Sequence, residues 1–431
     1  MPLFKNKQEL GWCFYDWGNS AFATTVMAGF FPVFFKEYWS QGVAVTESTA
    51  KLGLANSISG LVVALLAPVL GAIADRGSRK KKFLMLFAYL GALSTSALFF
   101  VARGQWPQAA LIYVMGTIGF SGGNIFYDAL LPGIVDDKKI DFVSALGYAM
   151  GYLGGGLLFA LNVWMTLSPA TFGLADAGEA VRVSFITAGV WWGVFTLPIM
   201  LFVPETQSAT AHSLRQAVRE GGRQLAHTFR KIRHLKTIGL FLAAYWLYID
   251  GVDTIVRMAV DYGLSIGFEA KDLIVALLIT QFVGFPSAIV YGRLGERIGA
   301  KRAIYLAIVV YLLVVLWAVR MSDKIEFYAL AIVIGLVQGG IQALSRSLYS
   351  RLIPHDQTAE FYGFYNLLGK FAVIFGPILI GVTGMISDSP RTGIASIAVL
   401  FVLGGLLLSF VDEKQGAAEV KHLRLTGGRP G

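Results

Sequence analysis

Seven ionisable residues lie inside long apolar stretches of the sequence. They are Asp16, Asp128, Asp250, Asp253, Arg257, Arg346 and Lys370. A charged side chain surrounded by apolar residues is costly unless it is paired or serves a solute or an ion. The chemistry that such residues could perform is the binding and release of a proton, an ion or a polar solute, together with ion pairs that form and break.

Three of these residues are spaced for one helical face. Asp250, Asp253 and Arg257 stand at i, i+3 and i+7, which places them in line along a helix. Asp253 and Arg257 could neutralise each other as a local pair. Asp250 would then lack a partner, which makes it the best candidate for a carboxylate that exchanges a proton or binds an ion.

Four amide side chains in the apolar stretches are further candidates for contacts to a substrate or a coupling ion. They are Asn19, Asn124, Gln338 and Gln342. Gln338 and Gln342 share a helical face with Arg346, at i, i+4 and i+8. The alternative for all four is a hydrogen bond that joins neighbouring helices.

Several kinds of chemistry have no support in the sequence. The five histidines lie in predicted loops or in the tail, and Cys13 is the single cysteine. There is no G-x-x-x-x-G-K-[ST] loop for ATP and no Ser-His-Asp or Cys-His set. We therefore expect no catalytic residues, no metal site, no cofactor and no enzymatic activity.

The amino-acid composition indicates whether the chain folds in water or in a membrane. Hydrophobic residues make up 55% of the 431 residues and charged residues only 15%, whereas soluble domains carry about 25% charged residues. The 49 glycines are spread through the apolar runs, as in membrane helices that pack closely. The sequence predicts an integral membrane protein in a lipid bilayer.

Twelve segments are long enough to cross the hydrocarbon core, which needs about 20 apolar residues. We place them at 12–35, 52–74, 83–102, 108–131, 142–165, 183–203, 237–260, 273–291, 303–319, 327–349, 361–386 and 392–411. They predict an N-terminal six-helix half (1–203), a cytoplasmic linker (204–236), a C-terminal six-helix half (237–412) and a cytoplasmic tail (413–431). The linker is either a solvated connector or an amphipathic helix on the inner leaflet.

Lysine and arginine set the orientation, because they accumulate in cytoplasmic loops. With both termini in the cytoplasm, 25 of the 36 lie in cytoplasmic segments and eight in external loops. The net charge of +9 is thus explained by topology, and we expect no nucleic-acid partner. The expected location is the inner (plasma) membrane.

Motifs recur six spans apart, which is typical of transporters built from two repeats. Trp12-x-x-x-Asp16 in the first span matches Trp246-x-x-x-Asp250 in the seventh. The loops after spans two and eight also match, and their predicted conformational residues are Gly71, Asp75, Arg76 and Arg79, and Gly292, Glu296, Arg297 and Arg302. In each loop, an acid can cap the end of a helix, glycine permits a tight turn, and the basic residues anchor the cytoplasmic side.

The first of these loops resembles the signature of the major facilitator superfamily. The stretches 15–25, 151–155, 342–354 and 360–377 are similar to the bacterial "unknown major facilitator" family, which is related to the autophagy-related vacuolar effluxers of fungi. The resemblance implies two pseudo-symmetric halves, spans one, four, seven and ten around a central cavity, and amino acids as a substrate class. The Gly-Pro typical of antiporters in span five is missing.

These observations predict a secondary transporter that moves a small polar solute by alternating access, as a monomer. A proton or another ion is a candidate coupling partner. The alternative is a receptor or regulator that binds a ligand without moving it. We also predict a cytoplasmic gate, in which Asp16 or Asp128 of the N-terminal half pairs with Arg346 or Lys370 of the C-terminal half.

Overall fold

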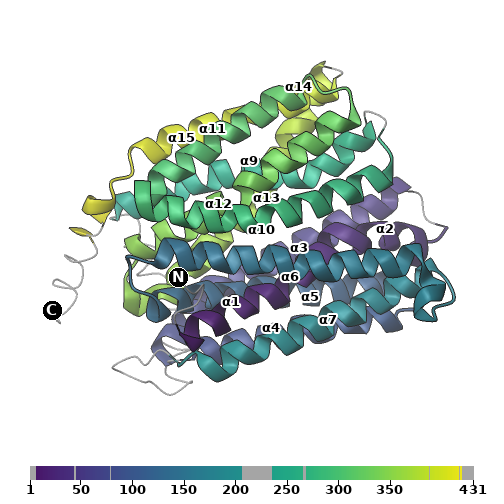
Figure 1. Ribbon diagram of the computed structural model, residues 1–431, viewed down its shortest axis with the longest axis horizontal. Coiled ribbons are helices and arrows are strands. Elements are labelled where there is room, and N and C mark those ends of the chain that lie inside the picture. Colours follow the sequence, from purple (N-terminus) through teal and green to yellow (C-terminus); the bar gives the residue numbers. More distant parts are fainter. Residues whose placement is uncertain are drawn as a thin grey trace. The chain divides into compact units, whose positions relative to one another are not determined.

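The structure is a computed structural model, and it describes residues 6–42, 45–77, 79–205, 235–265, 268–387, 389–416 and 418–419. Throughout these ranges the regular secondary structure is helical (Figure 1). Most of the predicted linker, including the candidate amphipathic helix, lies outside the described residues. So does the end of the predicted tail.

The first predicted span is one continuous helical segment of four parts: α1 (Lys7–Ala21), η1 (Phe22–Phe30), α2 (Phe31–Phe34) and η2 (Phe35–Trp39). The parts η1 and η2 have the wider π-helical geometry. Wide turns of this kind are uncommon and often lie near functional sites.

The remaining helices follow the predicted spans closely. They are α3 (Val45–Gly77), α4 (Lys80–Ala97) with η3 (Leu98–Phe100), α5 (Trp106–Ile134), α6 (Ile140–Leu167), η4 (Pro169–Phe172), α7 (Ala177–Phe202), α9 (Lys236–Ser265), α10 (Ala270–Ile298), α11 (Ala300–Ala318), α12 (Lys324–Leu352), η5 (His355–Gln357), α13 (Thr358–Ser387), α14 (Pro390–Ser396) and α15 (Ala398–Ser409). Within the described part of the chain, ten helices are long and apolar enough to cross a membrane. Helices α3 and α13, of 33 and 30 residues, coincide with the other two predicted spans, so the architecture is consistent with twelve crossings.

Polar residues at the helix ends explain where several helices begin. Asn6 accepts a hydrogen bond from Glu9 N before α1, and Asp176 accepts one from Glu179 N before α7. Asp323 and Glu326 form a reciprocal capping box at the start of α12. Such caps satisfy backbone N–H groups that the first turn leaves unpaired.

The described chain divides into two compact units. The first comprises residues 1–66, 80–127 and 147–205, and the second comprises 67–79, 128–146 and 206–431. Three short pieces of helices α3, α5 and α6 therefore belong with the C-terminal helices. These pieces include Asp75 and Asp128, two of the predicted site residues.

In the first unit, glycines allow helices to pack closely around α7. Helix α7 lies against both α1 and α4 (Figure 1). A Cβ on Gly11 of α1 would come within 2.7 Å of the Pro198 carbonyl oxygen, and one on Gly18 within 2.8 Å of Phe195 Cβ. Small residues at these positions give the close backbone approach that holds membrane helices together.

Lys81 and Glu205 join the ends of α4 and α7 in the same unit. Lys81 Nζ donates to the carbonyl oxygens of Met200 and Val203, at 2.9 and 2.8 Å, and Lys81 N donates to Glu205 at 3.2 Å. Burial raises the pKa of the Glu205 carboxyl, while the Lys81 hydrogen bond and charge act in the opposite direction. Lys81 thus satisfies carbonyl groups at the C-terminal end of α7.

In the second unit, α10 and α12 lie side by side, and α9 packs against both α13 and α15 (Figure 1). Gly340 of α12 lies directly against the Tyr291 ring of α10. A hydrogen bond of 2.7 Å joins the hydroxyls of Tyr248 and Ser345, linking α9 to α12. These contacts fix the helices that carry Asp250, Gln338 and Arg346.

Candidate functional site

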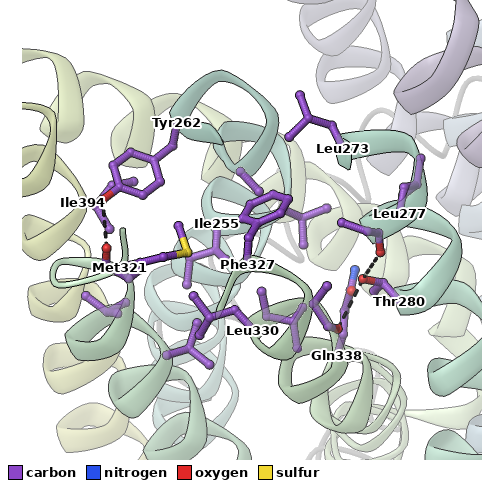
Figure 2. A pocket seen from close by; sticks show the side chains of 18 of the residues that line it. Ile255, Tyr262, Leu273, Leu277, Thr280, Met321, Phe327, Leu330, Gln338 and Ile394 are labelled. Carbon is purple, nitrogen blue, oxygen red and sulfur yellow. Dashed lines mark hydrogen bonds between the residues drawn. The ribbon is translucent and has the colours of Figure 1, made fainter. Parts of the chain in front are cut away.

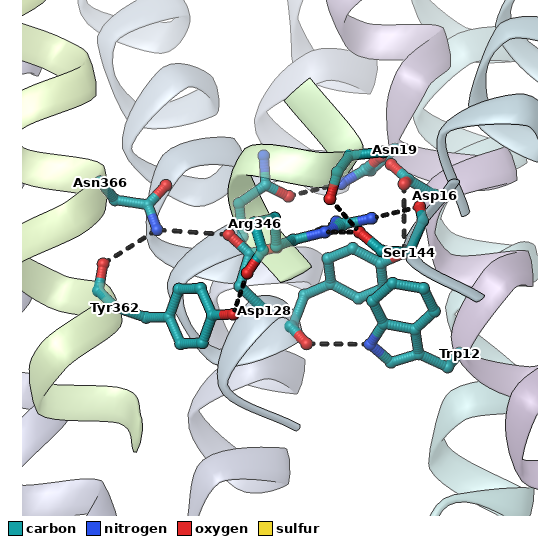
Figure 3. Close-up of polar contacts among 11 residues, drawn as sticks. Trp12, Asp16, Asn19, Asp128, Ser144, Arg346, Tyr362 and Asn366 are labelled. Atoms are coloured by element: carbon teal, nitrogen blue, oxygen red, sulfur yellow. Dashed lines mark hydrogen bonds and ion pairs between the residues drawn. The ribbon is translucent and has the colours of Figure 1, made fainter. Parts of the chain in front are cut away.

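Arg346 of α12 forms a buried ion pair with Asp128 of α5 (Figure 3). The distance from Arg346 Nη1 to Asp128 Oδ1 is 3.0 Å, and the two side chains are 2% and 10% exposed. Both residues belong to the second unit, although they come from opposite halves of the sequence. The structure therefore contains one of the four predicted gate pairs.

Ser144 of α6 receives the rest of the Arg346 guanidinium. Arg346 Nε donates to the Ser144 hydroxyl at 2.9 Å, and Nη2 donates to its carbonyl oxygen at 2.7 Å. The Ser144 hydroxyl donates in turn to the Ala343 carbonyl at 2.8 Å. A buried arginine is stable only if its charge is paired and its N–H groups are bonded, and Asp128 and Ser144 provide both.

A second contact between sequence halves forms one turn from Ser144. Asp141, in the first turn of α6, accepts a short hydrogen bond from the Ser347 hydroxyl and an ion pair of 3.0 Å from Arg351 Nη1. Arg351 Nε lies 3.9 Å from Glu413, which is partly exposed. Segments 128–146 and 346–351 are thus joined by two ion pairs and several hydrogen bonds.

Asp75, in the last turns of α3, caps the start of α13. Its carboxylate accepts hydrogen bonds from the backbone N–H groups of Ala359 and Glu360, at 3.2 and 2.8 Å. Thr358 Oγ1 donates to the Ala129 carbonyl at 3.0 Å. A carboxylate at a helix N-terminus is favoured by its free N–H groups and by the helix dipole. Gly71 makes this approach possible, because a Cβ there would overlap the Ala359 carbonyl.

The corresponding motif after the eighth predicted span has a close glycine contact like that of Gly71 but no helix cap like that of Asp75. Gly292 of α10 lies against the first turns of α6, where a Cβ would come within 2.6 Å of Ala145 Cβ and 3.1 Å of Phe142 Cα. Glu296, in contrast, is exposed, and no hydrogen bond joins its carboxylate to a described residue. We expected equal roles for Asp75 and Glu296, and in the structure their contacts differ.

The other predicted residues of the two loops are only partly described. Arg79 is half-buried, and Arg297 and Arg302 are exposed. The side chains of Arg76, Arg257 and Lys370 lie outside the described residues. The predicted Asp253–Arg257 pair and the gate pairs with Lys370 therefore stay predictions.

The N-terminal substrate candidates Asp16, Asn19 and Asn124 take part in two hydrogen bonds within the first unit. Asn19 Nδ2 donates to Asn124 Oδ1 at 2.7 Å, and the Tyr127 hydroxyl donates to Asp16 Oδ2 at 3.1 Å. Trp12 stacks on Tyr127 with ring centroids 4.2 Å apart. Asn19 Oδ1 is buried and has no hydrogen-bond partner among the described residues.

Asp250 has partners, contrary to our expectation. Gly376 N of α13 donates to both carboxylate oxygens at 3.1 Å, and Thr254 Oγ1 donates to Oδ1 at 3.1 Å. Pro377 follows Gly376 and has no N–H to continue the helical hydrogen bonds. Asp250 is 1% exposed and ties α9 to α13 at this Gly-Pro step, whereas Asp253 is half-buried.

Gln338 lines a cavity inside the second unit (Figure 2). The walls come from α9, α10, α11, α12 and α14 and are mainly aliphatic and aromatic. Gln342 lies one turn further along α12 and is half-buried.

Comparison with known families accounts for the whole described chain. Residues 5–421 match the family described as "Vacuole effluxer Atg22 like". The chain belongs to this family. It is 39% identical over 410 residues to YxiO of Bacillus subtilis, an uncharacterized MFS-type transporter, with 95% of each chain covered. Autophagy-related protein 22 of Eremothecium gossypii is 23% identical and matches 97% of this chain and 93% of its own length.

Solved structures show the fold of this Atg22-like chain. The proton:xylose symporter XylE superimposes with a TM-score of 0.70 and 13% identity, covering 97% of both chains. FucP in the outward conformation gives 0.71 and 12% identity over 94% of this chain and 98% of its own. The protein is therefore a multi-pass membrane protein with the major facilitator fold, and it is an MFS-type transporter.

The structure explains the motifs that carry the resemblance to the Atg22-like family. The glycines of α6 let α1 approach: a Cβ would lie 2.5 Å from Ser20 Oγ at Gly151, 2.5 Å from the Trp17 carbonyl at Gly154 and 2.8 Å from Thr24 Oγ1 at Gly155. The stretch 342–354 carries Arg346, and the stretch 360–377 carries Gly376. Tyr362 in the latter donates to the Arg346 carbonyl at 3.0 Å.

Sequence reasoning missed Asp141, Ser144 and Arg351. The sequence places Asp141 just outside the predicted fifth span and Arg351 in a predicted cytoplasmic loop. The repeat held a signal for Asp141, because Asp141-Phe142 begins span five as Glu360-Phe361 begins span eleven. Ser144 had no signal, since a serine in a membrane helix is common.

The different contacts of Asp75 and Glu296 predict different effects for equivalent substitutions in the two loops. We expect Asp75→Asn to slow transport about tenfold, because it removes the charge from a helix cap that contributes on the order of 1 kcal/mol or more. We expect Glu296→Gln to change the rate less than about twofold, because exposed charges contribute little. Rates in proteoliposomes with equal protein incorporation test this, and equal losses in the two variants would contradict it.

Proposed function

We propose that this transporter moves a small polar solute by alternating access, and that amino acids are the first class to test. Amino acids are the substrate class that the resemblance to the fungal vacuolar effluxers implies, and the matched family description, which names an effluxer and no substrate, supports transport itself. The support for alternating access is the set of polar contacts that joins segments from both sequence halves within the second unit, because ion pairs and hydrogen bonds of this kind can form in one state and break in another.

The Asp128–Arg346 pair is the observation that carries the proposal. Each residue would be a costly, unpaired charge in a membrane if the other moved away. In our proposal the pair and the Asp75 cap hold the cytoplasmic ends of the helices together in one state, and both break when that side opens. Opposite charges across two moving segments give a contact of this kind with two discrete arrangements.

Asp250 is proposed as the coupling residue. Its carboxylate accepts hydrogen bonds from the α13 backbone, so a change in its charge would alter how strongly α9 holds α13. Asn19, Asn124 and Asp16 are proposed to contact the solute from the first unit. The proposed setting is the plasma membrane, with both termini in the cytoplasm, a proton or another ion as coupling partner, and a monomeric chain.

A counterflow screen tests the proposed function. Purified protein is reconstituted into liposomes loaded with unlabelled amino acids, sugars or drugs, and uptake of the same labelled compound is measured. Transient accumulation of an amino acid, lost in Arg346→Gln, is the expected result. Saturable binding without counterflow would favour the receptor alternative, and accumulation of another class only would overturn the assignment of amino acids.

A further inference from the structure

The cavity beside Gln338 is lined by several buried side chains. Its volume is about 130 Å³. Tyr262, Met321, Phe327 and Ala331 all line it and are each less than a tenth exposed (Figure 2). A cavity of ~150 Å³ in another protein binds benzene, so the space is large enough for a small ring.

The cavity has few polar groups that could hold water in place. Thr280 Oγ1 donates to the carbonyl oxygens of Ala276 and Ala331, at 3.0 and 3.3 Å, and the Tyr262 hydroxyl donates to Ala318 at 2.8 Å. A buried water needs two to four polar partners. Most of the wall offers none, so water is a poor occupant of this space.

One acceptor at the cavity is unused. Gln338 Oε1 is buried and has no hydrogen-bond donor among the described residues, and a buried unpaired acceptor costs about 1–3 kcal/mol. A second amide side chain, Gln281, also lines the space. The cavity thus combines an apolar body with a lining amide whose oxygen lacks a donor among the described residues.

We propose that this cavity binds a compact apolar molecule, of about the size of one six-membered ring, that carries a single N–H or O–H donor directed at Gln338 Oε1. Phenols and small alcohols have this chemistry. The site is formed by helices of one unit, and it shares no lining residue with the Asp128–Arg346 pair or with Asp250. It is therefore distinct from the contacts assigned to the transport cycle.

The test uses phenol and toluene, which have the same shape and differ in the donor. Dissociation constants are obtained from the rise in unfolding temperature of purified protein with ligand concentration. Wild-type protein should show saturable stabilisation by phenol. Ala331→Leu, which fills the cavity, should lose it, whereas Ala329→Leu on the same helix does not line the cavity and should keep it.

Gln338→Met tests the donor independently of cavity filling, because methionine keeps the length of the side chain. The ratio of phenol affinity to toluene affinity should fall about fivefold in this variant, as expected for one neutral hydrogen bond. Stabilisation that is absent from wild-type protein, or equal in wild-type and Ala331→Leu protein, would overturn the site. An unchanged ratio in Gln338→Met would overturn the assignment of the donor.

Discussion

Arg346→Gln is expected to abolish most transport while the protein remains inserted in the membrane. The variant leaves Asp128 buried without its ion pair, and breaking a buried pair costs about 3–5 kcal/mol. Because about 1.4 kcal/mol corresponds to a tenfold change in an equilibrium, the closed arrangement of segments 128–146 and 346–351 would lose at least a hundredfold in relative population. The transporter would then cycle poorly because one of its two states is hardly populated.

Cysteine labelling measures this shift without a known substrate. In a Cys13→Ala background, a cysteine replaces Ala129, which is 2% exposed and lies beside Asp128 on α5. Its reaction with a maleimide should accelerate strongly in Arg346→Gln. Glu413→Gln is the matched control, because it removes only the loose, partly exposed contact with Arg351 and should leave the labelling rate nearly unchanged.

The charge swap decides whether the pair itself matters. Asp128→Arg and Arg346→Asp should each abolish transport, and the double variant should recover part of it. Recovery cannot be complete, because the new aspartate would face the Ser144 carbonyl that now accepts from Arg346. If the double variant is as inactive as the single ones and Ala129 is no more reactive in Arg346→Gln, these charges do not control the closed state.

The helices were predictable because lipid leaves so few alternatives. Each membrane segment must satisfy its own backbone and must contain about 20 apolar residues. The positions of Asp128 and Arg346 were also predictable, since charges of opposite sign stood near the same ends of spans from opposite halves. The predicted depth of these charges in the membrane did not decide which of them pair. Pairing also depends on the rotation of each helix about its axis, which is set by packing at residues such as Gly71 and Gly292.

The contacts of Asp250 and Glu296 could not be read from the sequence. Both looked like ordinary members of a repeat. Asp250 has partners because the backbone N–H of Gly376 in α13 donates to its carboxylate. A backbone donor of this kind cannot be predicted from the pattern of side chains in the sequence. The surroundings of Glu296 differ from those of Asp75 because equivalent sequence positions need not have equivalent neighbours when the two halves have diverged.

Gly376→Ala is expected to abolish transport through a steric effect at Asp250. The new Cβ would overlap Thr254 Oγ1 and come within 2.9 Å of Asp250 Oδ1. Helix α13 would have to move away from α9, which would break the hydrogen bonds from Gly376 N to the carboxylate. Gly369→Ala on the same helix is the control, because among the described residues its Cβ would meet only the Tyr245 side chain, 3.6 Å away at its hydroxyl.

Two further variants separate the packing at this site from the charge of Asp250. Thr254→Ala removes the hydroxyl that the new methyl would strike, so adding it to Gly376→Ala should restore part of the transport.

Asp250→Asn keeps the shape and one acceptor oxygen but removes the charge, so substrate exchange should persist while the pH dependence of uptake disappears. Uptake at several pH values and exchange at equilibrium distinguish these effects. Unaltered pH dependence in Asp250→Asn would show that the carboxylate serves only to hold α13, and full activity of Gly376→Ala would show that the contact is not needed at all.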